Sequence, residues 1–517
     1  MALVLRADST RSPFADDLLR RRFEREALEP FLSQQRWFAG KARTISHARL
    51  SDWPEDPTDG VMLTLVDVSY EDGGSDRYFM PLALVSAARQ TDAGPVESRH
   101  VMAKLEGVHS GLLVDAIADD DACRALIALM LSGRKVELRH GQTRPAVCDS
   151  AAEAPRHDPL TRNAREQSNS CVIFGERYVL KLLRRLEAGP NPELEISRFL
   201  SASRFTHTPP LIAALEYDGG GGDPTSLALV QGFVANDGTA WDHAVDDART
   251  FLLNDAPGAL STDGIGWLGP AAILGRRTAE MHAALASGER SAAFSPEPFT
   301  DTDADALAAR MAADAVRTLT RLEARLETVP ASVQPQVKAL LELKETLANR
   351  IRRVATATGG SIRTRVHGDF HLGQVLAADG DFIVIDFEGE PTRTLAERRA
   401  KQSPLKDVAG MLRSFGYAAN ITWLSIAETQ PDSSAQLAER ARQWEESVAR
   451  AFLGAYRETM ADIPVVPAAD EEFDRLLDAF ILEKVLYELD YELASRPHWI
   501  RIPLLSLLRI LDGNDRR

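Results

Sequence analysis

The stretch VHGDFHLGQVLAADGDFIVIDFEGEP, residues 366–391, holds two carboxylates and an amide at spacings that suit phosphate chemistry. Phosphoryl transfer to a hydroxyl needs one carboxylate to orient the hydroxyl and accept its proton, and further oxygen ligands to hold Mg²⁺ against the phosphates of ATP. Asp369, in His-Gly-Asp, fits the first role, and Gln374 and Asp386 fit the second. Protein kinases place a metal-binding Asn five residues after the catalytic Asp, which is the spacing of Asp369 and Gln374.

The residues between these groups predict a hairpin that would position them. Ala378-Asp379-Gly380-Asp381 has the chemistry of a tight turn, and the apolar run 382–385 is typical of a short strand that ends at Asp386. A lone Asp in such a setting is usually structural. The whole combination, with turn and strand in place, favours a kinase-type catalytic loop.

A lysine in an apolar strand is a second candidate for phosphate chemistry. Lys181 lies in the run 178–183, where an ammonium group is costly unless it reaches a partner. In kinase-like folds that partner set is the nucleotide phosphates and a helix carboxylate. Glu195 on the next predicted helix is the expected carboxylate, and Glu193 is the alternative. If Lys181 has no functional role, it is a solvated lysine at the edge of the strand.

Two further segments are candidates for nucleotide contacts. The loop 166–170 precedes the first hairpin, lacks a Gly-x-Gly-x-x-Gly pattern, and offers hydroxyl and backbone N–H groups at Ser168, Asn169 and Ser170. The end of a later strand, at Gln231, Phe233 and Val234, could hydrogen-bond an adenine through its backbone.

Composition narrows the class of protein. The chain has 517 residues, which predicts two or three domains, and a formal charge of −16 that is spread along the sequence and argues against nucleic-acid or anionic membrane surfaces. Its three cysteines form no Cys-x-x-Cys pair, and no segment approaches about twenty apolar residues. We therefore expect a cytoplasmic enzyme without a zinc site, a disulfide framework or a membrane span.

The pattern along the chain predicts an α+β, bilobal, protein-kinase-like fold behind a β-rich N-terminal cap. We expect a polar tail over 1–25, with a short helix at 25–31 beyond it, a cap over 26–110, an intermediate segment and N-lobe over 111–235, and a mostly helical C-lobe over 236–517 that contains the catalytic hairpin. Expected strands are 61–68, 77–84, 100–105, 170–174, 178–183, 211–217 and 227–234. Expected helices are 112–132, 193–202, 274–285, a packed pair within 303–355, 404–417, 435–458 and 471–511, and 145–165 is an expected connector.

Several segments together resemble the maltokinase family, bacterial enzymes of the aminoglycoside-phosphotransferase-like branch of the kinase fold. They are QQRWFAGKAR (34–43), EQSNSCVIFGERYVLKLLRRLEAGPNPELEISRFL (166–200), VHGDFHLGQVL, VIDFEGEP, SPLKDVAGMLRSFGYAA (403–419) and YELASRPHWIRIPL (491–504). The resemblance implies ATP and Mg²⁺ as cofactors, Asp369 as base, Gln374 and Asp386 at the metal, and maltose 1-phosphate as product. Block 166–200 is also similar to the maltokinase half of trehalose synthase fusions, which implies a separate trehalose synthase as a partner.

The acceptor is less constrained by these patterns. Aromatic, charged and amide groups that suit a sugar pocket gather near the C-terminus, at Tyr487, Tyr491, Arg496 and Trp499, and His371 and Glu388 lie in the catalytic stretch. Helix packing is the alternative role for the first group. A kinase of glucosamine or an aminoglycoside, and a catalytically silent kinase-fold binding protein, remain the competing functions.

Overall fold

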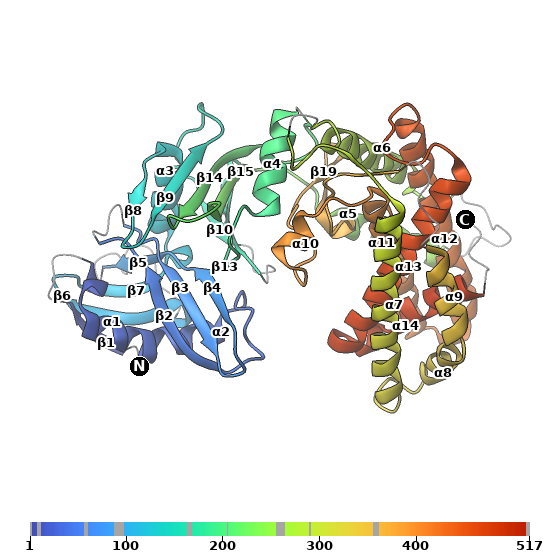
Figure 1. The fold of residues 1–517 in the computed structure, drawn as a ribbon, viewed down its shortest axis with the longest axis horizontal. Coiled ribbons are helices and arrows are strands. Elements are labelled where there is room, and N and C mark those ends of the chain that lie inside the picture. Colours follow the sequence, from blue (N-terminus) through green and yellow to red (C-terminus); the bar gives the residue numbers. More distant parts are fainter. Residues whose placement is uncertain are drawn as a thin grey trace. The chain divides into compact units, whose positions relative to one another are not determined.

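The computed structural model describes residues 3–7, 12–55, 60–86, 98–162, 168–203, 205–254, 264–288, 291–354 and 361–512. The chain forms two compact units (Figure 1). The first contains residues 1–198 and 209–235, and the second contains residues 199–208 and 236–517. The fold is a kinase-like α+β fold with an N-terminal cap, as predicted.

The cap is built from two four-stranded sheets and an N-terminal helical segment. One sheet has the order β1 (Leu3–Ala7), β6 (Val101–Gly107), β7 (Gly111–Asp115), β5 (Leu82–Val85), and the other β13 (Arg185–Leu186), β4 (Ser75–Phe79), β3 (Leu65–Tyr70), β2 (Ile45–Asp52). The helical segment comprises α1 (Asp17–Phe23), η2 (Glu24–Leu28) and α2 (Glu29–Gln34).

The expected polar tail over residues 1–25 is wrong. Strand β1 pairs in parallel with β6, and Leu5, Phe14 and Phe23 are buried in the cap core. Arg21 and Arg22 of α1 are exposed, while Leu19 and Phe23 of the same helix are buried in the cap core, so the arginine-rich segment is an amphipathic helix. Residues 8–11 lie outside the described part of the chain.

Two other expected boundaries also differ from the structure. The predicted helix 112–132 begins as strand β7, and helix α3 (Asp120–Ser132) starts only where Asp119 accepts a hydrogen bond from the N–H of Ala122. The predicted connector 145–165 overlaps β9 (Gln142–Val147) and β10 (Leu160–Arg162), which both join a larger sheet, because pairing with β14 and β11 overrides their weak strand signal.

This larger sheet forms the rest of the first unit. Its seven strands have the order β10, β11 (Ser170–Phe174), β12 (Tyr178–Leu182), β15 (Thr225–Gly232), β14 (Leu211–Asp218), β9 and β8 (Val136–Glu137). Both predicted hairpins are confirmed as antiparallel pairs, and helix α4 (Pro192–Ala202) follows the first of them as predicted.

A buried ion pair ties the cap to this sheet. The Arg184 guanidinium donates to Asp115 Oδ2 at 2.8 Å and to Ser170 Oγ at 2.8 Å, and it lies 4.6 Å from the centre of the Trp37 ring. Both charged side chains are almost fully buried, with 0% and 1% of their surface exposed. Asp115 Oδ1 also accepts from the N–H of Ile117 at 3.2 Å, so each buried charge is stabilised by the other and by neutral contacts.

The second unit is mostly helical. Its helices are α5 (Ala240–Leu253), α6 (Leu268–Leu285), α7 (Asp301–Ala324), α8 (Gln334–Glu342), α9 (Lys344–Val354), α10 (Leu395–Arg399), α11 (Leu405–Ala427), α12 (Ser434–Met460), α13 (Asp470–Ser495) and α14 (Arg501–Leu511). Two hairpins interrupt them, β16 (Glu297–Pro298) with β17 (Ile362–Arg363), and β18 (Val375–Ala378) with β19 (Asp381–Val384). Among the described residues, no helix is long and apolar enough to cross a membrane.

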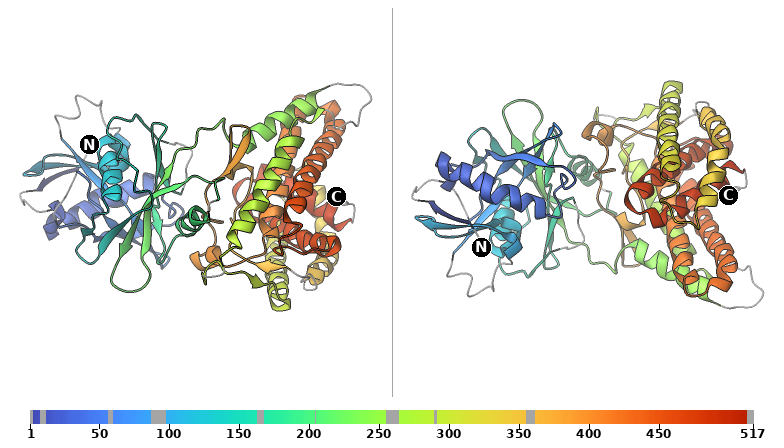
Figure 2. Two further views of the ribbon diagram at one scale, coloured as in Figure 1. Left: turned by 90° about the horizontal axis from the view of Figure 1, so that it is seen from above. Right: turned by 90° about the horizontal axis from the view of Figure 1, so that it is seen from below.

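Helices α6, α11, α12 and α13 form the core that supports the catalytic stretch. Helices α6 and α12 lie side by side (Figure 2), and Gly275 permits this, because a Cβ there would overlap the carbonyl of Phe452. Where a packed pair of helices was expected within 303–355, the structure has three, α7, α8 and α9. The expected helix 471–511 divides at Pro497 into α13 and α14.

The buried pair yields a stability prediction. Replacing Asp115 by Ala leaves the Arg184 guanidinium buried without a counter-charge, so urea unfolding should show a loss of about 3–5 kcal/mol. Asp67→Ala, which breaks the exposed pair with Arg77, is the matched control and should cost less than about 1 kcal/mol. Equal effects of the two substitutions would contradict a structural role for the Arg184–Asp115 pair.

Candidate active site

The hairpin after Asp369 has the predicted form. Ala378 pairs with Asp381, and the two residues between them, Asp379 and Gly380, both have positive φ, at 51° and 74°. This is the geometry of a type I′ turn, for which Asp-Gly is a favoured sequence. The hairpin returns the chain so that Ile385 N–H donates to the carbonyl of Gln374 at 3.0 Å.

The two predicted metal ligands meet at the base of this hairpin. Gln374 Nε2 donates to Asp386 Oδ2 at 2.9 Å, so the amide and the carboxylate lie close enough to share one ion. Asp386 has φ 66°, which is uncommon for a non-glycine residue, although Asp adopts it more readily than most. An amide oxygen and a carboxylate are hard ligands of the type that Mg²⁺ prefers, so the donor set fits this ion.

A buried carboxylate on α11 holds the turn that carries Asp369. Asp407 Oδ2 accepts from the N–H of His367 at 2.7 Å, and Asp407 Oδ1 accepts from the N–H of Gly368 at 2.9 Å. Gly368 has φ 85°, which favours glycine at this position. Helix α11 approaches the turn closely at Gly410, where a Cβ would lie 2.6 Å from the carbonyl oxygen of Phe370.

Asp407 is itself fixed by groups from two other helices. His282 Nε2 lies 3.2 Å from Asp407 Oδ2, and His282 Nδ1 lies 2.9 Å from the hydroxyl of Tyr456. Burial raises the pKa of Asp407, but the hydrogen bond and charge of His282, the charge of His367 and the Gly368 N–H together lower that pKa below its ordinary value. Asp407 is therefore ionised and accepts every bond that reaches it.

A second buried network reaches Asp369 itself. Lys484 Nζ lies 3.6 Å from Asp369 Oδ1 and donates to Glu390 Oε1 at 2.8 Å, and Glu390 also accepts from Arg393 at 3.3 Å. Burial lowers the pKa of Lys484, but Glu390 and Asp369 raise it well above the usual value. Burial raises the pKa of Glu390, yet the charges of Lys484, Lys406 and Arg393 bring it down to about 2. Asp369 thus lies beside a permanent positive charge.

His371 makes a structural hydrogen bond, one of the two roles considered for it. Its Nδ1 accepts from the N–H of Gly373 at 3.1 Å, and its Nε2 lies 4.0 Å from Asp369 Oδ2. Burial lowers the pKa of His371, Asp369 opposes this, and Lys484 adds to it, so the net pKa is below the ordinary value. A neutral ring that accepts at Nδ1 carries its proton on Nε2, on the side of Asp369.

The predicted sugar-binding side chains form a row along α13 and the turn after it. The Tyr487 and Tyr491 rings stack at 6.2 Å, Lys484 Nζ lies 4.8 Å from the Tyr487 ring, and Arg496 lies 5.3 Å from the Tyr491 ring. Arg496 also lies 4.3 Å from the Trp499 ring and donates twice to the buried carboxylate of Glu492. The row therefore begins at Lys484, beside Asp369, and continues through alternating rings and cations. Glu388 lies outside it, in the loop after Asp386, and its carbonyl accepts from Arg398.

In the first unit, Lys181 has a carboxylate partner, but the expected residue is wrong. Lys181 Nζ donates to Glu193 Oε2 at 2.6 Å, and both side chains are buried. Glu193 lies in the first turn of α4, where its N–H donates to the Asn191 side chain. Glu195 is two residues further on and so points to a different face of the helix, about 200° away. The alternative that the sequence left open is the observed pair.

The other nucleotide candidates are partly engaged in structural bonds. Ser170 begins β11 and its hydroxyl accepts from Arg184, and the N–H of Phe233 donates to the carbonyl of Arg177 at 2.9 Å. Gln231 lies inside the sheet, paired with both β12 and β14. Ser168 is exposed, whereas residues 166 and 167 lie outside the described residues.

Three buried groups around Asp369 were not singled out from the sequence. They are Asp407, Glu390 and Lys484. A signal existed for Lys484, because it interrupts the apolar positions of ILEKVL, residues 481–486, just as Lys181 interrupts its strand. For Asp407 the sequence offers only a helix start after Pro404, which does not reveal what the carboxylate bonds.

Comparison with known proteins identifies two family matches and several relatives of this chain. Residues 31–119 match the maltokinase N-terminal cap domain, and residues 159–426 match the phosphotransferase enzyme family. The chain is 34% identical to a glucosamine kinase of Streptacidiphilus jiangxiensis, over 67% of this chain and 72% of that one, and 30% identical to one of Mycolicibacterium smegmatis, over 67% and 78%. A solved glucosamine kinase in complex with glucosamine, ADP and inorganic phosphate has a TM-score of 0.65 and 26% identity, over 93% of this chain and 99% of that one.

The second family match covers more than half of the chain, and it contains both the Lys181 strand and the loop from Asp369 to Asp386. The protein therefore belongs to the phosphotransferase enzyme family, behind a maltokinase N-terminal cap domain.

Proposed function

We propose that the protein is an ATP-dependent sugar kinase that transfers the γ-phosphate of ATP to the anomeric hydroxyl of maltose and releases maltose 1-phosphate and ADP. The observation that carries the sugar assignment is the row of rings and cations on α13 that begins beside Asp369. The cap match and the quoted maltokinase-like segments support maltose as the acceptor. A separate trehalose synthase is the proposed source of maltose.

In this proposal Asp369 takes the proton of the attacking hydroxyl. The carboxylate orients that hydroxyl toward the γ-phosphate, and most of the rate acceleration comes from holding the two reacting groups in line. Lys484 holds Oδ1 of Asp369, so the other oxygen is the one left for the sugar. Lys181, fixed by Glu193, is the proposed cation for the nucleotide phosphates.

Gln374 and Asp386 are the proposed Mg²⁺ ligands. The ion, when bound, neutralises phosphate charge. The two side chains are held next to each other by the hairpin and by the backbone of Asp386, so little of the chain must move for the amide and the carboxylate to face one ion. Such preorganisation lowers the cost of binding.

The length of the α13 row favours an acceptor with two rings. Lys484 and Tyr491 are seven residues apart, which corresponds to about 10 Å along a helix. A single hexose at Asp369 would leave the Tyr491 end of the row uncovered, whereas the second ring of maltose would reach it. Aromatic faces with a few charged groups are typical of sugar pockets.

Glucosamine is the second candidate, because both similar proteins quoted above are glucosamine kinases. Its ammonium group would have to lie near Lys484 and Arg496 along this row, and Glu390 and Glu492 offset the charges of these two cations only in part. Maltose has no charge and does not meet this repulsion. Initial rates of ADP release with maltose, glucose and glucosamine decide between the candidates, and maltose should give the highest kcat/KM.

Asp369→Asn should lower kcat by about 10²- to 10⁴-fold with little change in ATP affinity, because it removes the proton acceptor and keeps the shape. Asp379→Asn, at the tip of the same hairpin, is the matched control and should turn over at the parent rate. Turnover of Asp369→Asn near that of the control would refute the base assignment.

Asp386→Asn should weaken Mg·ATP binding in calorimetry while leaving binding of metal-free ATP nearly unchanged, since it removes one anionic oxygen. Asparagine tolerates the positive φ of this position, so a change in affinity would not come from backbone strain. Gln374→Ala should act in the same direction with a smaller effect. Parent-like Mg·ATP affinity in the Asp386 variant would contradict the metal role.

Tyr491→Ala should raise KM for maltose about tenfold with a smaller change in kcat, as expected when binding shared by the ground and transition states is lost. Trp499→Ala should show the same pattern. Glucose serves as the internal control, because a single ring does not reach Tyr491, and its KM should not change. A parallel loss for both sugars would argue against the outer subsite.

A further inference from the structure

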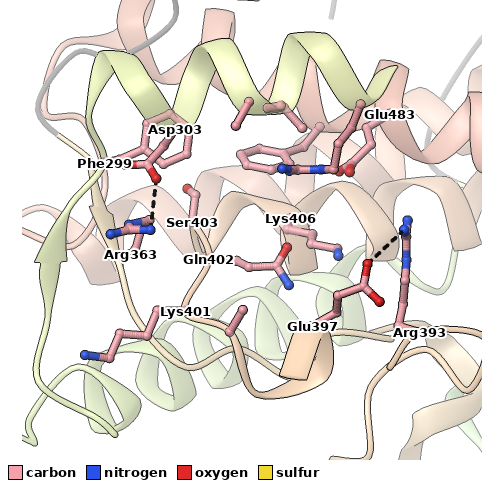
Figure 3. A pocket seen from close by; sticks show the side chains of 15 residues that line it. Phe299, Asp303, Arg363, Arg393, Glu397, Lys401, Gln402, Ser403, Lys406 and Glu483 are labelled. Carbon is pink, nitrogen blue, oxygen red and sulfur yellow. Dashed lines mark ion pairs between the residues drawn. The ribbon is translucent and has the colours of Figure 1, made fainter. Parts of the chain in front are cut away.

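A cavity on the second unit, separate from the α13 row, has no role in the proposed reaction. Its volume is about 250 Å³, and it lies among α7, α10, the start of α11 and α13 (Figure 3). This volume is smaller than that of pockets that hold drug-sized ligands, which is about 300–1,000 Å³, so a ligand of this cavity would be smaller than a nucleotide. The cavity shares four lining residues with a narrow second cavity, Arg393, Lys406, Phe480 and Glu483. The second cavity is also lined by Gly368 and Phe370, the residues before and after Asp369 in the sequence.

The lining carries an excess of positive charge. The cations are Arg310, Arg363, Arg393, Lys401 and Lys406, and the carboxylates are Asp303, Glu397 and Glu483. Three of the cations are engaged: Arg363 pairs with Asp303 at 2.9 Å, Lys401 with Glu297 at 2.5 Å, and Arg393 with Glu390 at 3.3 Å.

Arg310 and Lys406 differ from these three. Within the part of the chain that the structure describes, neither side chain makes a hydrogen bond or an ion pair of 4.0 Å or less. Figure 3 shows the Lys406 ammonium and the Gln402 amide directed into the same space, with the Arg363–Asp303 pair at one end and the Arg393–Glu397 pair at the other. Both cations make no direct contact with a carboxylate, although the charge of Lys406 acts on Glu390 and that of Arg310 on Glu397. Two such cations at one cavity suit a dianion, and the neighbouring amide, hydroxyl and carboxylate groups suit sugar hydroxyls.

The cavity is also connected by charge to the base. Arg393 bonds Glu390, Glu390 bonds Lys484 at 2.8 Å, and Lys484 lies 3.6 Å from Asp369. Glu390 is thus shared between cations on the cavity side and Lys484 on the base side. An anion bound at Lys406 and Arg393 would weaken the attraction of these two cations for Glu390. Glu390 would then attract Lys484 more strongly and draw it away from Asp369.

We propose that this cavity binds a phosphorylated monosaccharide and that its occupation lowers turnover by withdrawing Lys484 from Asp369. The inference goes beyond the proposed function, because it concerns a second site and does not depend on which sugar is the acceptor.

Calorimetry with glucose 6-phosphate as the probe tests binding directly. The full chain is first saturated with Mg²⁺ and a non-hydrolysable ATP analogue, so that the probe's phosphate cannot occupy the nucleotide site. We expect one site, with glucose and inorganic phosphate each binding at least about tenfold more weakly than the probe. Absence of binding, or equal binding of inorganic phosphate, would overturn the proposal.

Variants locate the site. Arg310→Gln and Lys406→Gln should each weaken binding of glucose 6-phosphate about tenfold. Arg317→Gln, on the same helix α7 but outside the cavity lining, is the matched control and should bind as the parent does. Parent-like binding in both cavity variants would place the ligand elsewhere and refute the assignment.

Kinetics test the coupling. Glucose 6-phosphate should lower kcat in a way that saturating ATP and acceptor do not reverse, and Arg310→Gln should keep the basal kcat while losing most of this inhibition. Inhibition that excess ATP or acceptor abolishes would mean binding at the catalytic site and would contradict a separate regulatory cavity.

Discussion

The two hydrogen bonds from the backbone of His367 and Gly368 to the Asp407 carboxylate are the constraint on which the candidate site depends. They fix a turn whose glycine has positive φ, and this turn sets where the next residue, Asp369, projects. Asp407 can do this because it is buried, ionised and held by His282, which in turn contacts Tyr456. Helices α6, α11 and α12 therefore pack together not only to form a core but also to hold one carboxylate against two N–H groups.

Asp369 is held by charge as well as by backbone. Asp369, Lys484, Glu390 and Arg393 alternate in sign, and the buried Glu390 lies between two cations, one of which lies beside Asp369. The same principle operates in the first unit, where Arg184 and Asp115 join the cap to the sheet that bears Lys181. The cap is thus joined by a buried ion pair to the sheet that carries Lys181.

The sequence predicted the parts of the site that are local along the chain. The Asp-Gly turn, the strand that ends at Asp386, the spacing of Asp369 and Gln374 and the two hairpins around Lys181 all depend on neighbours within a few residues, and the structure has them. The features that the sequence could not reveal depend on tertiary contacts. Lys181 pairs with Glu193 and not Glu195 because of how α4 is rotated, and β10 is a strand because β11 pairs with it. The role of Asp407 is recognisable only once the His367 turn lies against α11.

In the proposed reaction, Asp369 and the α13 row together direct phosphate to the anomeric oxygen of a two-ring sugar. The most direct test is ³¹P NMR of the product formed from maltose and ATP by the full chain. We expect the product to be a phosphate ester whose phosphorus couples to the C1 proton of the reducing-end ring. A phosphorus that couples to the C6 protons, or product formed from glucosamine and not from maltose, would contradict it.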